Sequence, residues 1–390
     1  MVRIKRILSI FLILALTFSC ASLAEEGSSV FTRDMVERSL RGVGNTQRLH
    51  NVIDKARRGE EITLVYLGGS ITEGALAVPQ SSRCYAALSA RQFAEKYMPD
   101  PSRMNYVNAG ISGTPSLLGI TRLEQDVLVH SPDVVFVEFA VNDSADPVSQ
   151  MVYESLIRRL LQSDSQPAVV LIFTLMREGH TCQPHMLQVG KHYDLGMISV
   201  VDAVKVQIIL GKMQWSDYSS DYTHPNNDGH AFIADLISHY FDQAAAVKPT
   251  PYTLPEEAVF GMDLQHLKNV RNGDAALVST GDFPFGLVTC YSYKQGWKHT
   301  SGAEPLTLRL TASYLTLAFR QENNQACGTA EVLVDGVVKA TLPGHAGNAW
   351  GNVVTQLIDL GGSGEHTIEI HMSPGSEDKR FNLLDIAYAP

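Results

Sequence analysis

Residues 62–74 read Ile-Thr-Leu-Val-Tyr-Leu-Gly-Gly-Ser-Ile-Thr-Glu-Gly, an apolar run that ends in two glycines and a serine. The run from Ile62 to Leu67 has the composition of a strand buried on both faces, which is typical of parallel sheets covered by helices. Ser70 follows this strand at its carboxyl end, where open α/β sheets place their sites. Serine also caps many helices, so this segment alone leaves a catalytic and a structural role open for Ser70.

The alternation of apolar strands with helical segments continues to about residue 248. Such alternation predicts a parallel sheet with helices on both faces. We therefore expect an α/β domain over residues 30–248. Beyond the first strand, we expect strands at 103–108, 133–139, 168–174 and 198–202, and helices at 82–97, 115–130, 147–163 and 228–246.

The pattern changes after residue 248, and the prolines in 248–255 indicate a linker. Short segments with alternating polarity follow, separated by turn signals such as Asp335-Gly336. This pattern predicts a β-sandwich over residues 256–390. Strands are expected at 306–310, 314–319, 330–334 and 366–370. A chain of 390 residues suits two domains, and no internal repeat is evident.

The first 24 residues predict export from the cytoplasm. Basic residues at 3, 5 and 6 precede an apolar run over 7–18, and small residues follow at 22–24. This is the pattern of a cleavable signal peptide, and the apolar run is too short for a membrane span. Cys20 leaves a lipoprotein open as the less favoured alternative, because residues 17–19 match a lipobox poorly.

Charge and cysteine content exclude some classes of partner. Removal of residues 1–24 leaves 28 Lys and Arg against 41 Asp and Glu, a formal charge of −13. Such a surface disfavours nucleic acid and anionic lipid and suits a neutral substrate. The four remaining cysteines show no metal-ligand spacing, and no cofactor or metal is implied. Buried thiols are the default expectation, with a Cys290–Cys327 bridge as the alternative.

Three more segments at expected strand or loop ends carry groups that an acyl transfer needs. Gly113 lies in a glycine-containing turn after the 103–108 strand and could present its backbone N–H, and Asn142 follows the 133–139 strand and could donate from its side chain. Asp221 and His224, three residues apart on a loop, could form a carboxylate–imidazole pair. Each segment has a structural alternative by itself, as a turn, a surface polar group or a helix cap. Together with Ser70 they supply a nucleophile, a base and oxyanion donors.

The order of these segments resembles the SGNH hydrolases, the GDSL-like esterase superfamily. Ser70, Gly113 and Asn142 match the serine, glycine and asparagine of the first three blocks, and Asp221 and His224 match the last. The resemblance covers roughly residues 60–246. The start Gly-Gly-Ser replaces the commoner Gly-Asp-Ser, with glycine at position 69. This variant shifts the expected substrate toward carbohydrate and leaves the class intact.

The resemblance implies a three-layer α/β/α domain with a five-stranded parallel sheet, followed by the β-sandwich. It also implies a serine esterase with Ser70, Asp221 and His224 as catalytic residues, and with the Ser70 and Gly113 N–H groups and Asn142 as the oxyanion hole. The Ser70 segment, Cys84-Tyr85 and residues 183–193 look like those of bacterial polysaccharide-deacetylating esterases.

The expected substrate is therefore an acetylated glycan. Glu73, Trp297 and Trp350 are candidate substrate-binding residues, although a core role is the ordinary alternative for each tryptophan. Two other functions stay open: a lipid esterase or thioesterase of the same superfamily, and a glycan-binding protein with an inactive α/β scaffold.

Overall fold

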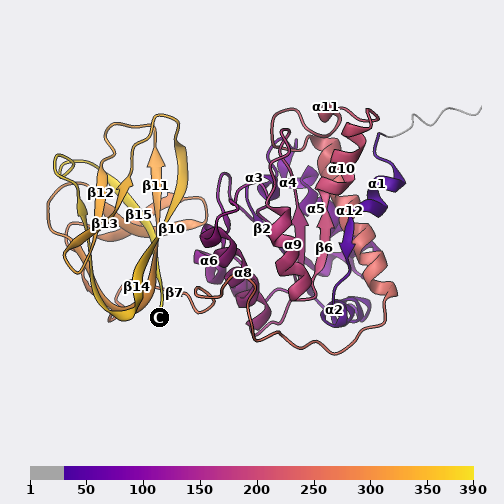
Figure 1. Ribbon diagram of the computed structural model, residues 1–390, viewed down its shortest axis with the longest axis horizontal. Coiled ribbons are helices and arrows are strands. Elements are labelled where there is room, and N and C mark those ends of the chain that lie inside the picture. The colour runs from indigo at the N-terminus through magenta and orange to yellow at the C-terminus, as the bar shows by residue number, and fades with distance from the viewer. Residues whose placement is uncertain (1–29) are drawn as a thin grey trace, which may run out of the picture. The chain divides into compact units, whose positions relative to one another are not determined.

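The computed structural model describes residues 30–390 (Figure 1). The expected signal peptide, 1–24, and Cys20 lie outside the described residues. Within residues 30–390, no helix is both long and apolar enough to cross a membrane.

The α/β region is built on a six-stranded sheet in the order β1-β6-β5-β4-β2-β3. The five strands β2 to β6 pair in parallel, as the sequence predicts. Strand β1 adds an antiparallel edge beside β6 and was not predicted, because its three residues, Leu-Arg-Gly, carry no strand pattern. The bounds are β1 Leu40–Gly42, β2 Ile62–Gly68, β3 Met104–Gly110, β4 Val134–Glu138, β5 Ala168–Phe173 and β6 Gly196–Ser199.

Helices cover both faces of this sheet, which gives the three layers that the sequence predicts. Helices α2 (Gln47–Arg57), α5 (Tyr85–Tyr97) and α12 (Asn227–Ala246) contact one another, and α8 (Pro147–Gln162) contacts both α6 (Ser116–Thr121) and α9 (Gln183–His192). Every residue of β4 and β5 is buried, which explains why both strands are apolar without alternation. The remaining helical segments are α1 Arg33–Ser39, α3 Ser70–Glu73, α4 Gln80–Arg83, α7 Leu123–Asp126, α10 Val200–Ile209, α11 Trp215–Tyr218, η1 Pro101–Arg103 and η2 Leu128–His130.

Three expected boundaries are wrong. The strand expected at 198–202 ends at Ser199, whose Oγ accepts the Asp202 N–H at 2.9 Å and so caps α10. The helix expected at 115–130 is divided into α6, α7 and η2. The helix expected at 82–97 is interrupted where Cys84 adopts an extended backbone between α4 and α5.

The C-terminal strands form the expected antiparallel β-sandwich, with a main strand order β13-β12-β14-β11-β15-β10-β9. Asp335 and Gly336 both have positive φ, 51° and 79°, and form the two-residue turn between β12 and β13. The strands expected at 306–310 and 314–319 are one long strand, β11, with an irregularity between Ala312 and Tyr314. The bounds are β7 Lys268–Asn269, β8 Leu277–Ser279, β9 Phe285–Cys290, β10 Tyr293–His299, β11 Leu306–Glu322, β12 Thr329–Val334, β13 Val337–Pro343, β14 Trp350–Met372 and β15 Phe381–Ala389.

The β-sandwich packs on the segment that follows β3. Ile111 and Leu118 share an apolar cluster with sandwich residues such as Val288 and Leu384. Asn269 Nδ2 donates to the Thr121 carbonyl at 2.8 Å, which adds a hydrogen bond to this contact. The domain boundary near residue 248 stays a prediction, because both regions belong to the same compact unit.

The segment between the two regions is held by a buried carboxylate. Glu154, on α8, has no exposed surface and accepts the backbone N–H groups of Val259, Phe260 and Gly261 at 2.7, 2.6 and 3.1 Å. Tyr193 Oη also donates to Glu154, at 2.6 Å. The connecting chain is therefore part of the packed structure.

All four cysteines of the described chain are buried free thiols. Cys290 Sγ donates to the Gly351 carbonyl and Cys327 Sγ to the Glu322 carboxylate. The default expectation of buried thiols is therefore confirmed, and the alternative Cys290–Cys327 bridge is absent.

Candidate active site

Ser70 is placed by the end of β2 and the start of a single helical turn. Ser70 is the first residue of α3 and follows Gly69, the N-cap residue. The Ser70 N–H therefore has no acceptor within the helix. A Cβ atom on Gly69 would lie 2.2 Å from Asn142 Oδ1. Close approach to Asn142 therefore leaves no room for a side chain at position 69 in this arrangement.

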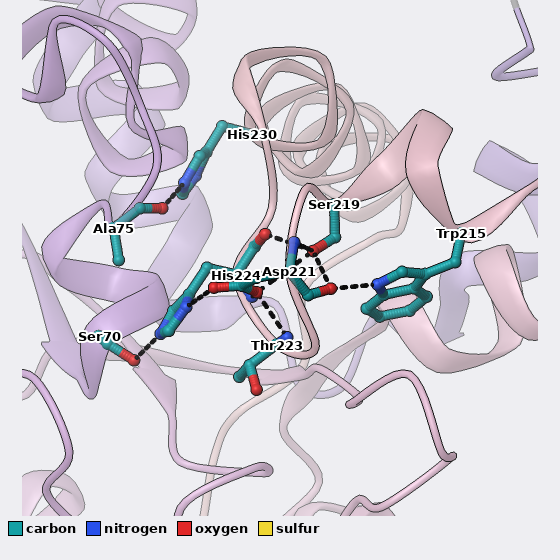
Figure 2. Close-up of polar contacts among 8 residues, drawn as sticks. All are labelled: Ser70, Ala75, Trp215, Ser219, Asp221, Thr223, His224 and His230. Atoms are coloured by element: carbon teal, nitrogen blue, oxygen red, sulfur yellow. Dashed lines mark hydrogen bonds and ion pairs between the residues drawn. The ribbon is translucent and has the colours of Figure 1, made fainter.

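Ser70, His224 and Asp221 form an unbroken chain of hydrogen bonds (Figure 2). His224 Nε2 lies 2.9 Å from Ser70 Oγ, and His224 Nδ1 lies 2.7 Å from Asp221 Oδ2. Ser70 is 6% exposed, while the His224 and Asp221 side chains are 27% and 41% exposed. The serine therefore sits at the bottom of a site that is open on the side of its partners.

The loop that carries Asp221 and His224 is fixed by its own hydrogen bonds. Asp221 Oδ1 accepts the N–H groups of Thr223 and His224, each at 2.7 Å. Trp215 Nε1 donates to the Asp221 carbonyl at 2.6 Å, and Ser219 Oγ donates to the His224 carbonyl at 2.6 Å, as Figure 2 shows. Partial burial acts to raise the pKa of Asp221, but hydrogen bonds from His224 and the backbone outweigh it and lower the pKa. Asp221 is therefore a carboxylate that orients the imidazole.

A second histidine, His230, lies near the Ser70–His224–Asp221 chain, as Figure 2 shows. Its Nδ1 accepts the Tyr85 N–H at 3.2 Å, so its Nε2 donates to the Ala75 carbonyl at 3.1 Å. Burial lowers the pKa of His230 to about 4, so its ring is neutral. No role for His230 was predicted, because its position as the fourth residue of α12 carries no distinguishing signal.

The two further candidate oxyanion donors come from the turns after β3 and β4. Gly113 has φ +71°, a left-handed conformation that glycine adopts without strain. Asn142 Oδ1 is buried against Gly69 and has no hydrogen-bond partner among the described residues. The oxyanion donor of this side chain would be Nδ2, because the amide oxygen can only accept a hydrogen bond.

Two buried carboxyl groups, those of Glu138 and Asp143, were not predicted from the sequence. Glu138, at the end of β4, accepts hydroxyl hydrogen bonds from Thr174 at 2.5 Å and from Thr72 at 3.2 Å. Asp143 accepts the Ser116 N–H at 2.7 Å and thereby ties the turn after β4 to α6. Burial raises the pKa of each carboxyl to about 7. The available signal was a glutamate inside the otherwise apolar run at 133–139.

Glu73 contacts the end of β3 and the turn that follows it through both its side chain and its backbone. Its carboxylate accepts a short hydrogen bond from Ser112 Oγ, and a Cβ atom on Gly110 would lie 2.1 Å from the Glu73 backbone nitrogen. Glu73 therefore holds the turn that carries Gly113 close to α3.

The two candidate tryptophans have different positions. Trp350, at the start of β14, is 62% exposed, and its ring carbon Cζ2 lies 3.0 Å from the place of a Cβ on Gly113. Its Nε1 donates to Tyr291 Oη at 3.3 Å. Trp297 is 2% exposed and packs edge-on against Phe285 within the β-sandwich. The structure thus brings Trp350, but not Trp297, to the turn that carries Gly113.

Comparison with known proteins agrees with this architecture. Residues 66–232 match the GDSL-like Lipase/Acylhydrolase family. The chain is 27% identical over 184 residues to Thioesterase 1/protease 1/lysophospholipase L1 of Escherichia coli, an alignment that covers 45% of this chain and 81% of that protein.

Two crystal structures of a two-domain esterase active on acetylated mannans, one of them with mannopentaose, resemble this chain over both of its regions. Each has a TM-score of 0.80 and 25% identity and covers 91% of this chain, and 97% and 98% of the chains compared. The expected α/β domain with a following β-sandwich and the expected carboxylic ester hydrolase are therefore confirmed. Residues 66–232 of this chain therefore have the sequence pattern of the GDSL-like lipase/acylhydrolase family, the SGNH hydrolases.

Proposed function

We propose that this protein is a carbohydrate acetylesterase that removes acetyl groups from an O-acetylated polysaccharide or oligosaccharide. The observation that carries the proposal is the hydrogen-bonded chain from Asp221 through His224 to Ser70, with distances of 2.7 and 2.9 Å. The likeness to an esterase active on acetylated mannans, over 91% of this chain, supports a glycan substrate. Acetylated mannan and xylan are therefore the first substrates to test.

In the proposed reaction, Ser70 Oγ attacks the acetyl carbonyl while His224 Nε2 takes the hydroxyl proton. Asp221 stabilises the resulting imidazolium. The carbonyl oxygen gains negative charge and accepts hydrogen bonds from the Ser70 and Gly113 N–H groups and Asn142 Nδ2. The bond between the acetyl carbon and the sugar oxygen then breaks, and His224 returns the proton to that oxygen.

Water completes the cycle. His224 removes a proton from a water molecule, whose oxygen attacks the acetyl-enzyme carbonyl, and the bond to Ser70 Oγ breaks with return of the proton. Acetate leaves, and Ser70 is regenerated. Every atom is accounted for by the ester, one water molecule and the three side chains, so no cofactor enters the scheme.

Two candidate substrate residues receive different roles in this proposal. Trp350 offers an exposed ring beside the Gly113 turn, where a sugar that carries the acetyl group can pack against it. Glu73 shapes the site through Ser112, because its carboxylate is already used in that contact. The indole of Trp350 is therefore the group that distinguishes a sugar ester from a small ester.

The test is acetate release from acetylated mannan and acetylated xylan by the full chain and by Ser70→Ala. We expect release by the wild type, its loss in the variant, and labelling of the wild type at Ser70 by a fluorophosphonate. Activity that survives in Ser70→Ala, with labelling of another serine, would contradict the mechanism.

The identity with an Escherichia coli thioesterase and lysophospholipase supports one alternative, a lipid esterase or thioesterase. Esters of 4-nitrophenol with acyl chains of 2 to about 12 carbons separate the two functions. Preference for acetyl supports the proposal, and preference for long chains supports the alternative. A protein that binds glycan and hydrolyses none of these esters would be the inactive scaffold.

Export is the last part of the proposal, and it rests on the basic and apolar pattern of residues 1–24. Mass spectrometry of the protein recovered from culture medium tests it. A mature N-terminus near residue 25 is expected, whereas a lipid-modified N-terminus at Cys20 would indicate the lipoprotein.

A further inference from the structure

A groove with a volume of about 530 Å³ lies between the β-sandwich and the α7 segment, apart from the catalytic residues. Its floor is formed by Tyr293, Trp297, Leu384 and Asp385, which are all buried, and its rim includes Gln125 and Lys294. We call it the lateral groove. Its volume is within the range of about 300–1,000 Å³ that is typical of small-molecule sites.

Three lining residues of the lateral groove carry a buried donor that no described residue satisfies. These donors are Gln125 Nε2, Tyr293 Oη and Trp297 Nε1. Tyr293 and Trp297 are 3% and 2% exposed. Because buried polar groups without a partner are costly, three of them on the same groove point to a ligand rich in acceptor oxygens.

The lining of the lateral groove also carries charged groups, the carboxyl group of Asp385 and the cations Arg271 and Lys294. Asp385 is an acceptor on the floor, where Asn269 Nδ2 donates to Oδ2 at 3.0 Å and the Ile386 N–H to Oδ1 at 2.9 Å. Burial raises the pKa of Asp385 to about 7, although the nearby Arg271 acts in the opposite direction. The apolar floor, the three hydrogen-bond donors and the carboxyl acceptor together match a sugar ring. Its hydroxyl groups both donate and accept hydrogen bonds, and its C–H faces are apolar.

The lateral groove is adjacent to the segment that carries the oxyanion turn. A second hollow, of about 350 Å³, shares Gln125 and Ser292 with it and is also lined by Ile111 and Tyr291. Tyr291 Oη accepts the hydrogen bond from Trp350 Nε1 at 3.3 Å. The residues that line the two hollows therefore extend from the Trp350 ring, which lies beside Gly113, to the floor of the lateral groove.

We propose that the lateral groove is a second carbohydrate site, which binds unmodified sugar units of the glycan chain whose acetyl group is held at Ser70. Gln125, Tyr293 and Trp297 donate to sugar oxygens there, and Asp385 accepts from a hydroxyl. This inference rests on the proposed acetylesterase function for its ligand class. Its role is to anchor the chain, because binding energy from remote parts of a substrate helps to orient the reacting group.

The test is calorimetric titration of the full chain with unacetylated mannan and xylan oligosaccharides of two to six sugars. Tyr293→Phe and Trp297→Phe, combined, remove two donors and keep aromatic packing. Tyr388→Phe, on β15 outside the groove, is the matched control. One lost hydrogen bond lowers affinity by about three- to tenfold, so the double variant should bind at least about tenfold more weakly than the wild type. Gln125→Met tests the third donor without a change in the sandwich core.

The control is expected to bind like the wild type, and all variants should hydrolyse 4-nitrophenyl acetate at the wild-type rate. The double variant should also lose kcat/KM on acetylated polymer through KM. Wild-type affinity in both the double variant and Gln125→Met would overturn the inference, as would absence of oligosaccharide binding by the wild type. Neither result would affect acetate release by Ser70, which tests the proposed function separately.

Discussion

Replacement of Gly69 by alanine tests how the glycine before the nucleophile supports catalysis. Gly69 has φ −91° and so lies outside the left-handed region that favours glycine. The new Cβ would lie 2.2 Å from Asn142 Oδ1 and 2.9 Å from its Cγ. An ordinary contact needs about 3.4 Å or more, so the Asn142 amide must move by about 1 Å.

Such a displacement moves Asn142 Nδ2 out of the oxyanion site. Loss of one oxyanion donor typically lowers kcat by about 10²–10³-fold. We therefore expect Gly69→Ala to lower kcat for 4-nitrophenyl acetate by about 10²-fold with little change in KM. Asn142→Ala should have a similar effect, and an effect confined to KM would mean that Asn142 only positions substrate.

A double-mutant cycle tests whether Gly69→Ala acts through Asn142. If Gly69→Ala acts through Asn142, it should cause little further loss in the Asn142→Ala background. Gly286→Ala, where a Cβ would meet no atom within 4 Å, controls for the general effect of a methyl group. Wild-type kcat in Gly69→Ala, or a full additional loss in the double variant, would refute the proposed coupling.

Three other results are expected. His224→Ala should be nearly as severe as Ser70→Ala, whereas Asp221→Asn should retain more activity because the backbone hydrogen bonds still hold its loop; comparison of kcat for the two variants checks this, and equal loss would contradict it. Burial raises the pKa of Asp143 to about 7, so the folded state binds more protons than the unfolded state between about pH 4 and 7. The free energy of unfolding should therefore fall as pH rises through this range. Thermal unfolding of Asp143→Asn should show a smaller fall with pH, and an unchanged slope would exclude this carboxyl group as the cause. Trp350→Ala should raise KM for acetylated glycan and leave 4-nitrophenyl acetate hydrolysis unchanged, and an equal loss on both substrates would contradict a role in sugar binding.

The parts of the fold that were predictable are those with local patterns. Strands β4 and β5 are continuous apolar runs, and the Asp335-Gly336 turn has the residues that its positive φ values require. The spacing of Asp221 and His224 on one loop also predicted their hydrogen bond, which the structure shows at 2.7 Å.

The parts that were missed depend on contacts between distant segments. Nothing local shows that β1 pairs with β6, or that His230 is a neutral ring between Tyr85 and Ala75. Trp297 and Trp350 have similar local signals, yet the first is buried and the second is exposed. Tertiary packing decides between these outcomes, and a single sequence contains no direct measure of it.

The anchoring of the connecting segment by Glu154 determines where the chain can be divided. A shortened α/β region ending at residue 248 would lack the three N–H groups, at 259–261, that Glu154 accepts. A buried carboxylate deprived of its donors is strongly destabilising. Leu264 and Leu267 are also buried in the apolar cluster of the α/β region. The α/β region therefore includes the chain as far as Leu267, and a β-sandwich exchanged between enzymes should be joined after that residue.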